Sequence, residues 1–122
     1  MAGNPIRDHA REQADVLLRR FREEVARTEK QPDADSVHDL RVSIRRLRQC
    51  LRTFEAFFPA GRTRKSRREL KRILELAAEV RNRDITMAFL ERSGFSTDDA
   101  LARDRARAER RLMAALRKQK VR

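Results

Sequence analysis

The chain has no tryptophan or tyrosine, and only one cysteine, three glycines and three prolines among its 122 residues. The single cysteine, Cys50, excludes an intrachain disulfide and makes a reducing compartment the default expectation. So few glycines and prolines argue against a β-sandwich and against a disordered tail. No stretch approaches the ~20 apolar residues of a transmembrane helix, and residues 1–13 lack the apolar core of a secretory signal. We therefore expect a cytoplasmic helical protein with no part in a membrane.

Charged residues, by contrast, are abundant. They make up 41% of the chain, against 39% hydrophobic residues, and the formal net charge is +12. Between Arg41 and Arg72, twelve lysines and arginines face only two acidic residues, Glu55 and Glu69, which gives +10 within 32 residues. The rest of the chain contributes only +2. Such a local excess predicts a polyanionic partner: a phosphate polymer, a nucleic acid or an anionic membrane.

Apolar residues recur at spacings of three and four along four segments, the pattern of amphipathic helices. The expected helices cover residues 5–30, 36–58, 63–92 and 97–118, all in one domain of residues 1–122. Because the links between them are short, successive helices should pack side by side and run in opposite directions. The sequence therefore predicts an all-α fold, an antiparallel four-helix bundle.

The second segment carries the most regular apolar pattern. Its buried seam should consist of Val37, Leu40, Ile44, Leu47 and Leu51. We expect Ser36 to be the N-cap of this helix, because Ser36 with Asp39 three residues later resembles a capping box. Ser96 with Asp99 predicts the start of the fourth helix in the same way. The six phenylalanines fall mainly at seam or helix-end positions, so we expect them in the core rather than on the surface as base-stacking platforms.

A row of basic side chains follows the edge of this seam, displaced from it by one residue. The row consists of His38, Arg41, Arg45, Arg48 and Arg52. At ~1.5 Å per residue, Arg41 to Arg52 cover roughly 16 Å, which suits a linear polyanion better than a single phosphate. Guanidinium groups are always charged and bind phosphate oxygens bidentately. The third helix should add Arg64, Arg68 and Lys71 to the same groove.

Four classes of function are compatible with a basic helical protein, and the sequence ranks them. A nucleic-acid backbone would suit these arginines, but the row offers only Gln49 for base reading and no free aromatic ring. Hydrolysis of a phosphate polymer would need clustered carboxylates around a metal, and Glu55 and Glu69 are isolated. A membrane-surface helix is disfavoured because the apolar seam is needed for the core. Binding of a phosphate polymer, the fourth class, remains the expected function, with nucleic-acid binding as the alternative. We therefore expect no enzyme activity, no catalytic residue, no metal site and no cofactor.

The stretch "VHDLRVSIRRLRQCLRTF", beginning at Val37, resembles the signature of the CHAD domain, the conserved-histidine α-helical domain. "ELKRILELAAEVRNRDI" and "ALARDRARAERRLMAALR" resemble the later helices of that family. The resemblance implies a helical module that binds inorganic polyphosphate along a basic channel without catalysis. Matched residue by residue, it selects His38, Arg41, Arg45, Arg46, Arg48 and Lys71. Arg46 enters the predicted site through this resemblance alone.

Two departures from the family pattern affect the prediction. Many members have a second aspartate where this chain has Thr86. The usual domain is also about twice as long and contains two four-helix bundles related by pseudo-twofold symmetry, so the resemblance implies one half of that architecture here. We expect a homodimer that rebuilds the channel, with two copies of the His38 row facing each other. Association with polyphosphate granules is a further expectation from the family.

Overall fold

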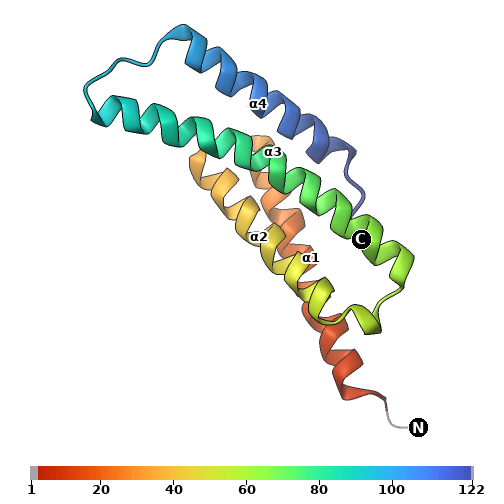
Figure 1. The fold of residues 1–122 in the computed structure, drawn as a ribbon. Coiled ribbons are helices and arrows are strands. Elements are labelled where there is room, and N and C mark those ends of the chain that lie inside the picture. Colours follow the sequence, from red (N-terminus) through yellow and green to blue (C-terminus); the bar gives the residue numbers. More distant parts are fainter. Residues whose placement is uncertain (1–2, 122) are drawn as a thin grey trace.

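A computed structural model describes residues 3–121, which form four α-helices and no strands (Figure 1). The elements are α1 (Pro5–Lys30), α2 (Ala34–Thr53), the short 3₁₀ helix η1 (Glu55–Phe57), α3 (Ala60–Arg92) and α4 (Asp99–Lys118). Met1, Ala2 and Arg122, which the predicted domain of residues 1–122 includes, lie outside the described residues. The contacts between the helices fit a four-helix bundle, so the predicted fold class is confirmed.

The long helix α3 is central to the arrangement. It packs against α2 along one side and against α4 along the other, while α1 packs against α2 and meets α4 only slightly (Figure 1). The α3–α4 hairpin continues past the turn that joins α1 to α2 (Figure 1). Cavities lie on both sides of α3, one between α2 and α3 and one between α3 and α4.

Apolar residues from all four helices build one continuous core. The predicted seam of α2, from Val37 to Leu51, is buried throughout, with Leu40 and Ile44 fully enclosed. The remaining core residues are Phe21, Val25, Leu70, Ile73, Leu76, Ala77, Val80, Ala108, Leu112, Leu116 and Val121. Burying each larger side chain contributes about 1.5–3 kcal/mol to folding. Burial of the seam fixes the orientation of α2 about its axis and leaves its basic residues outside the core.

The predicted N-caps of two helices are wrong by a few residues. Asp33, not Ser36, caps α2: the Asp33 carboxylate accepts the backbone N–H of Ser36 at 2.9 Å, and the Ser36 hydroxyl accepts the N–H of Asp33 at 3.1 Å. This reciprocal pair is a capping box that begins three residues earlier than predicted. In the same way Asp98, not Ser96, caps α4 by accepting the N–H of Leu101 at 2.9 Å.

Helix α2 also ends before the predicted boundary at residue 58. Its last residue is Thr53, and the chain then forms η1 before α3 begins after Pro59. A proline disfavours helical geometry in the residue before it, and Phe58 accordingly has extended backbone angles of φ −120° and ψ 153°. At the other end of α3, Ser93 is the C-cap and Gly94 adopts φ 84°, the left-handed conformation in which many helices end.

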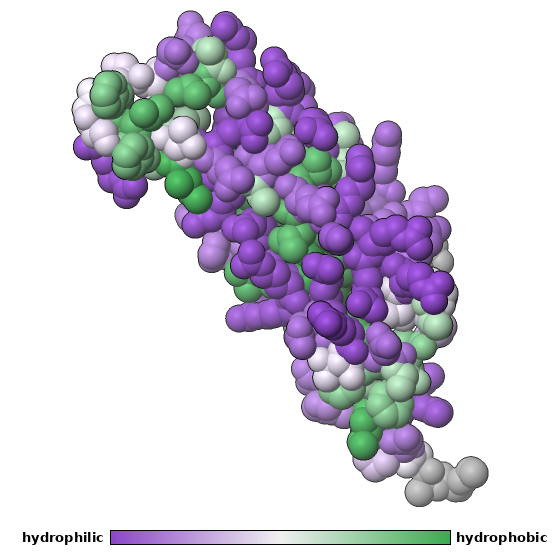
Figure 2. Space-filling view, viewed as in Figure 1, coloured by the Kyte–Doolittle hydropathy of each residue, from purple (hydrophilic) through white to green (hydrophobic). Residues whose placement is uncertain are grey.

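The expectation that the phenylalanines are core residues holds only in part. Phe21 is fully buried, whereas Phe89 and Phe95 are 58% and 65% exposed near the α3–α4 turn, where Ile85 is also exposed. Figure 2 shows apolar surface gathered at this end of the molecule, beyond a predominantly hydrophilic middle. Among the described residues, no helix is both long enough and apolar enough to cross a membrane.

Candidate functional site

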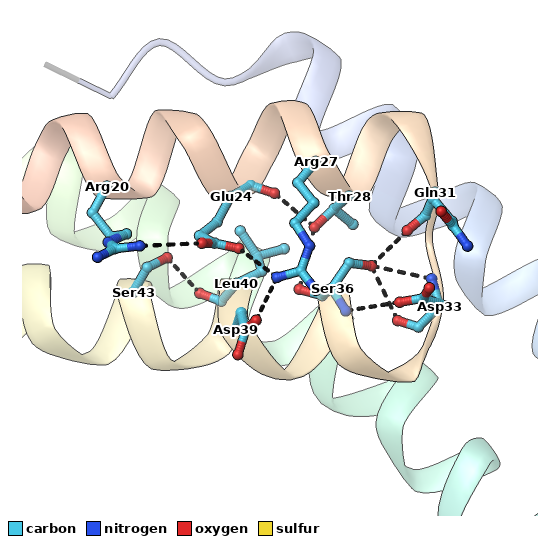
Figure 3. A network of polar contacts seen from close by, with 10 residues as sticks. All are labelled: Arg20, Glu24, Arg27, Thr28, Gln31, Asp33, Ser36, Asp39, Leu40 and Ser43. Carbon is cyan, nitrogen blue, oxygen red and sulfur yellow. Dashed lines mark hydrogen bonds and ion pairs between the residues drawn. The ribbon is translucent and has the colours of Figure 1, made fainter.

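The flank of α2 that faces α1 carries a network of balanced charges (Figure 3). Glu24 of α1, only 8% exposed, lies 3.9 Å from Arg20 and 3.4 Å from Arg27. Arg27 also donates to Asp39 of α2, and chiefly this hydrogen bond raises the pKa of the Arg27 guanidinium. The Thr28 hydroxyl donates to the Glu24 carbonyl of its own helix at 2.7 Å and to the Ser36 carbonyl of α2 at 3.3 Å. On this side of α2, Glu24 and Asp39 already have arginine partners.

The flank of α2 that faces α3 is different, because arginines accumulate there from both helices. A cavity of about 220 Å³ is lined by Arg45, Arg48, Gln49 and Arg52 of α2 and by Arg67 of α3. Arg41 continues this row by one turn, and the positive charges of Arg45 and of Arg81 on α3 both act on it. We call this surface, from Arg41 and Arg81 to Arg52 and Arg67, the α2–α3 groove.

Arg41 is the most strongly perturbed residue of the groove. Its partial burial, reinforced by the charges of Arg45 and Arg81, lowers the pKa of its guanidinium from the ordinary value. An arginine remains charged even so. The lowered pKa therefore reflects the position of Arg41, which is partly removed from water and lies near two other positive charges.

Two guanidinium nitrogens in the groove have no hydrogen-bond acceptor among the described residues. The Nε atoms of Arg41 and Arg48 are both buried and unpaired. A buried donor without an acceptor costs about 1–3 kcal/mol, and more when the group is charged. An anion in the groove would provide both the missing acceptors and the missing negative charge.

Only one carboxylate with an ion pair to a groove arginine is found in the described part of the chain. Glu55 of η1 accepts from Arg67 at 3.2 Å, and its side chain is 63% exposed. Glu69, the other acidic residue of the basic segment, accepts instead from the backbone N–H of Lys120 at 3.4 Å and lines a cavity between α3 and α4. Among the described residues, a carboxylate therefore forms an ion pair with the groove only at its Arg67 end.

The structure brings four of the predicted site residues together along the groove and places two others, His38 and Arg46, on the opposite flank of α2. Arg41, Arg45, Arg48 and Arg52 lie along the α2–α3 groove. His38 and Arg46 instead line a different cavity of about 400 Å³ on the α1 side, where Arg20, Glu24 and Asp39 also lie.

The three residues predicted from the third helix are all exposed. They are Arg64, Arg68 and Lys71. Lys71 follows Arg67 by one helical turn and so lies beside the groove, and Arg64 precedes Arg67 by three residues. Arg68 is rotated by ~100° from Arg67, toward the α4 side.

Two groove residues, Arg67 and Arg81, are missing from the predicted site. They are fourteen residues apart, close to four helical turns, and therefore lie on one face of α3. Half-buried Leu74 and Ala78 occupy the same face between them. The spacing of Arg67 and Arg81 could have identified them from the sequence, but only if the face of α3 that packs against α2 had been known.

Asp84, just beyond Arg81 on α3, has a structural partner. Its Oδ1 accepts from Arg105 of α4 at 3.0 Å, and Arg105 also donates to Glu109 and to the Pro32 carbonyl at 2.9 Å. Asp84 is therefore paired with an arginine of α4 and not with Arg81 or Arg83 of its own helix.

Other reactive groups do not assemble into a site in residues 3–121. No group of three histidine, cysteine or acidic side chains is placed to hold a metal ion in that range. Cys50 is 7% exposed, and burial raises the pKa of its thiol, so it packs as a neutral side chain.

Comparison with known proteins gives one family assignment. No curated protein and no solved structure matches the chain. The sequence model of the CHAD domain matches residues 7–122, which include α1 from its third residue and all of α2, α3 and α4. Because this match extends over nearly the whole sequence, the chain belongs to the CHAD domain family.

Proposed function

We propose that the protein binds inorganic polyphosphate without catalysis, through the α2–α3 groove. The CHAD domain is in general a polyphosphate-binding domain. The observation that carries the proposal is the pair of buried, unpaired guanidinium nitrogens of Arg41 and Arg48, in a groove where Arg45 and Arg81 add further positive charge. Such a site is unfavourable when empty and is stabilised by an anion.

The shape of the groove supports a linear ligand. Arginines lie on both walls, from Arg41 opposite Arg81 to Arg52 opposite Arg67, and the α2 row is ~16 Å long. A chain of phosphates places acceptors continuously along such a row, whereas a single phosphate would satisfy only one end. Lys71 extends the basic wall beside Arg67.

A charge-reversal experiment tests this assignment. The triple variant Arg41→Glu, Arg45→Glu, Arg48→Glu should lose more than about 100-fold in polyphosphate affinity, because each charge-assisted hydrogen bond contributes about 1.5–3 kcal/mol. The matched control reverses three exposed arginines of α1, Arg7, Arg19 and Arg22. The control should retain most of the affinity at equal net charge. Equal losses in both variants, with helix content preserved, would assign binding to net charge and reject the groove.

Competition separates polyphosphate from the nucleic-acid alternative. Polyphosphate should displace labelled duplex DNA at far lower phosphate equivalents, because the groove matches a narrow, flexible chain and offers only Gln49 for base reading. Equal competition per phosphate would favour nucleic-acid backbone binding. Both ligands should lose affinity as salt rises, so the comparison is made at one ionic strength.

The proposed assembly is a homodimer with twofold symmetry, in which the grooves of two copies face each other and form one basic channel. A channel of this kind surrounds a polyanion on two sides, which increases the number of charge-assisted contacts per phosphate. In the cell, we place the protein in the cytoplasm, associated with polyphosphate granules.

A further inference from the structure

Helix α4 has a second row of arginines on its outward face. Arg103, Arg107, Arg110 and Arg117 are all exposed and follow one another at spacings of four, three and seven residues. This spacing keeps them on one side of the helix, with Ala114 filling the remaining position of the row. From Arg103 to Arg117 the row is ~21 Å long. We call it the α4 row.

Asp104 and Glu109 of α4 are directed away from this row. Asp104 accepts from Arg83 of α3 at 2.9 Å, and Glu109 pairs with Arg105 on the flank that faces the α1–α2 loop. Asp99, the third acidic residue of α4, precedes Arg103 by about one helical turn and so lies at the N-terminal end of the row, but it forms no ion pair with Arg103. In the described range, none of the four arginines of the row has an ion-pair partner.

The composition of α1 shows that such a basic excess is not common to all helices of this chain. Between Pro5 and Lys30, α1 carries seven basic and six acidic residues, which give an exposed face of mixed charge. Between Asp99 and Lys118, α4 carries seven basic and three acidic residues, and two of those three form ion pairs away from the row. Mutual repulsion among like charges at these spacings destabilises a helix unless an anion offsets it.

We propose that the α4 row is a second polyphosphate-binding surface, separate from the α2–α3 groove. It deepens the function proposed above and rests on it. Helix α3 lies between α2 and α4, so the two basic surfaces occupy different sides of it (Figure 1). The row has no aromatic residue and no amide side chain, which leaves phosphate charge as the feature it can recognise. Charge complementarity and length therefore select the same class of ligand for both surfaces.

Two binding surfaces would allow one protein molecule to cross-link polyphosphate. It could hold two separate polyphosphate chains, or two distant parts of one long polyphosphate chain. Linking two weak contacts in this way raises the overall affinity for long chains far above that for short ones, since the second contact becomes intramolecular.

Titration calorimetry with a short polyphosphate tests the proposal. The probe is a polyphosphate chain of defined length that extends over about 20 Å, close to the length of one row. The variant with Arg103, Arg107, Arg110 and Arg117 all replaced by Gln should bind one such chain fewer per protein chain than the wild-type protein, whether each groove binds alone or two grooves share one polyphosphate chain. A control with Arg7, Arg11, Arg19 and Arg22 of α1 replaced by Gln, equal in charge and also exposed, should bind as many chains as the wild-type protein.

Glutamine keeps helix propensity and the row is outside the core, so all variants should retain wild-type helix content. Equal stoichiometry in the wild-type protein and the α4 variant would overturn the second surface while leaving the groove assignment intact. Loss of all binding in the Arg41, Arg45, Arg48 triple variant would also overturn it, because the α4 row should still bind one chain. An α4 variant that loses duplex DNA binding but keeps the wild-type polyphosphate stoichiometry would assign the row to nucleic acid instead. If the wild-type protein binds no polyphosphate, both proposals fail together.

Discussion

Glu55 is the residue at which the groove can be tuned. Its carboxylate forms an ion pair with Arg67 at one end of the α2–α3 groove, so a polyanion that reaches Arg67 must compete with Glu55. The ion pair is substantially exposed, and such pairs are weak. Replacement of Glu55 by Gln should therefore raise polyphosphate affinity by about two- to fivefold, measured by calorimetry at low salt.

The control for this effect is an acidic residue remote from the groove. Glu23→Gln on α1 changes the net charge by the same amount at an exposed position. It should raise affinity less than Glu55→Gln does. Equal increases in the two variants would show that Glu55 acts through net charge alone and does not compete for Arg67.

Asp33 links the stability of α2 to pH. Hydrogen bonds from Ser36, the backbone N–H first, lower the pKa of the Asp33 carboxyl below its ordinary value of 3.8. A lowered folded-state pKa means that the cap stabilises the fold at neutral pH and that this contribution is lost as the pH falls below about 4. The variant Asp33→Ala should thus have a lower melting temperature at pH 7, and the difference from wild type should shrink at pH 3. A difference that is the same at both pH values would contradict this role.

At the scale of helices, Arg105 ties three elements together. It connects α4 to Asp84 of α3 and to the Pro32 carbonyl in the α1–α2 loop, and its side chain is only 19% exposed. Replacement of Arg105 by Met should lower the free energy of unfolding by about 1–3 kcal/mol, because it leaves the carboxylate of Asp84 and the Pro32 carbonyl without their donor. Urea denaturation measures this loss. The double variant Asp84→Asn, Arg105→Met should lose less than the two single variants combined, and full additivity would show that the pair is not coupled.

The helices themselves were predictable, because their apolar spacing is a local property of the sequence. The seam from Val37 to Leu51 is buried as expected. The ends were less predictable, since several polar residues compete to cap each helix: Asp33 and Ser36 are both acceptable N-caps, and only the folded loop selects Asp33.

At the scale of the whole molecule, the site was only half predictable. A helical wheel identifies the row from Arg41 to Arg52, but cannot say which neighbour lies on each flank. The structure places His38 and Arg46 toward α1 and brings Arg81 of α3 toward Arg41. Forty residues separate Arg41 from Arg81, so their approach depends on the register of α2 against α3, which no local pattern contains.

The proposed dimer gives a prediction for the assembled molecule. Each chain carries a net charge of +12, so two grooves facing each other repel until a polyanion lies between them. With polyphosphate present, light scattering at micromolar concentration should therefore give a mass of twice the 14.4 kDa of one chain, and in the free protein moderate salt should favour the dimer by screening the repulsion. The Arg41, Arg45, Arg48 triple variant should lose the effect of polyphosphate on the mass. A mass of one chain both with and without polyphosphate would contradict the dimer and leave each groove to bind its ligand from one side.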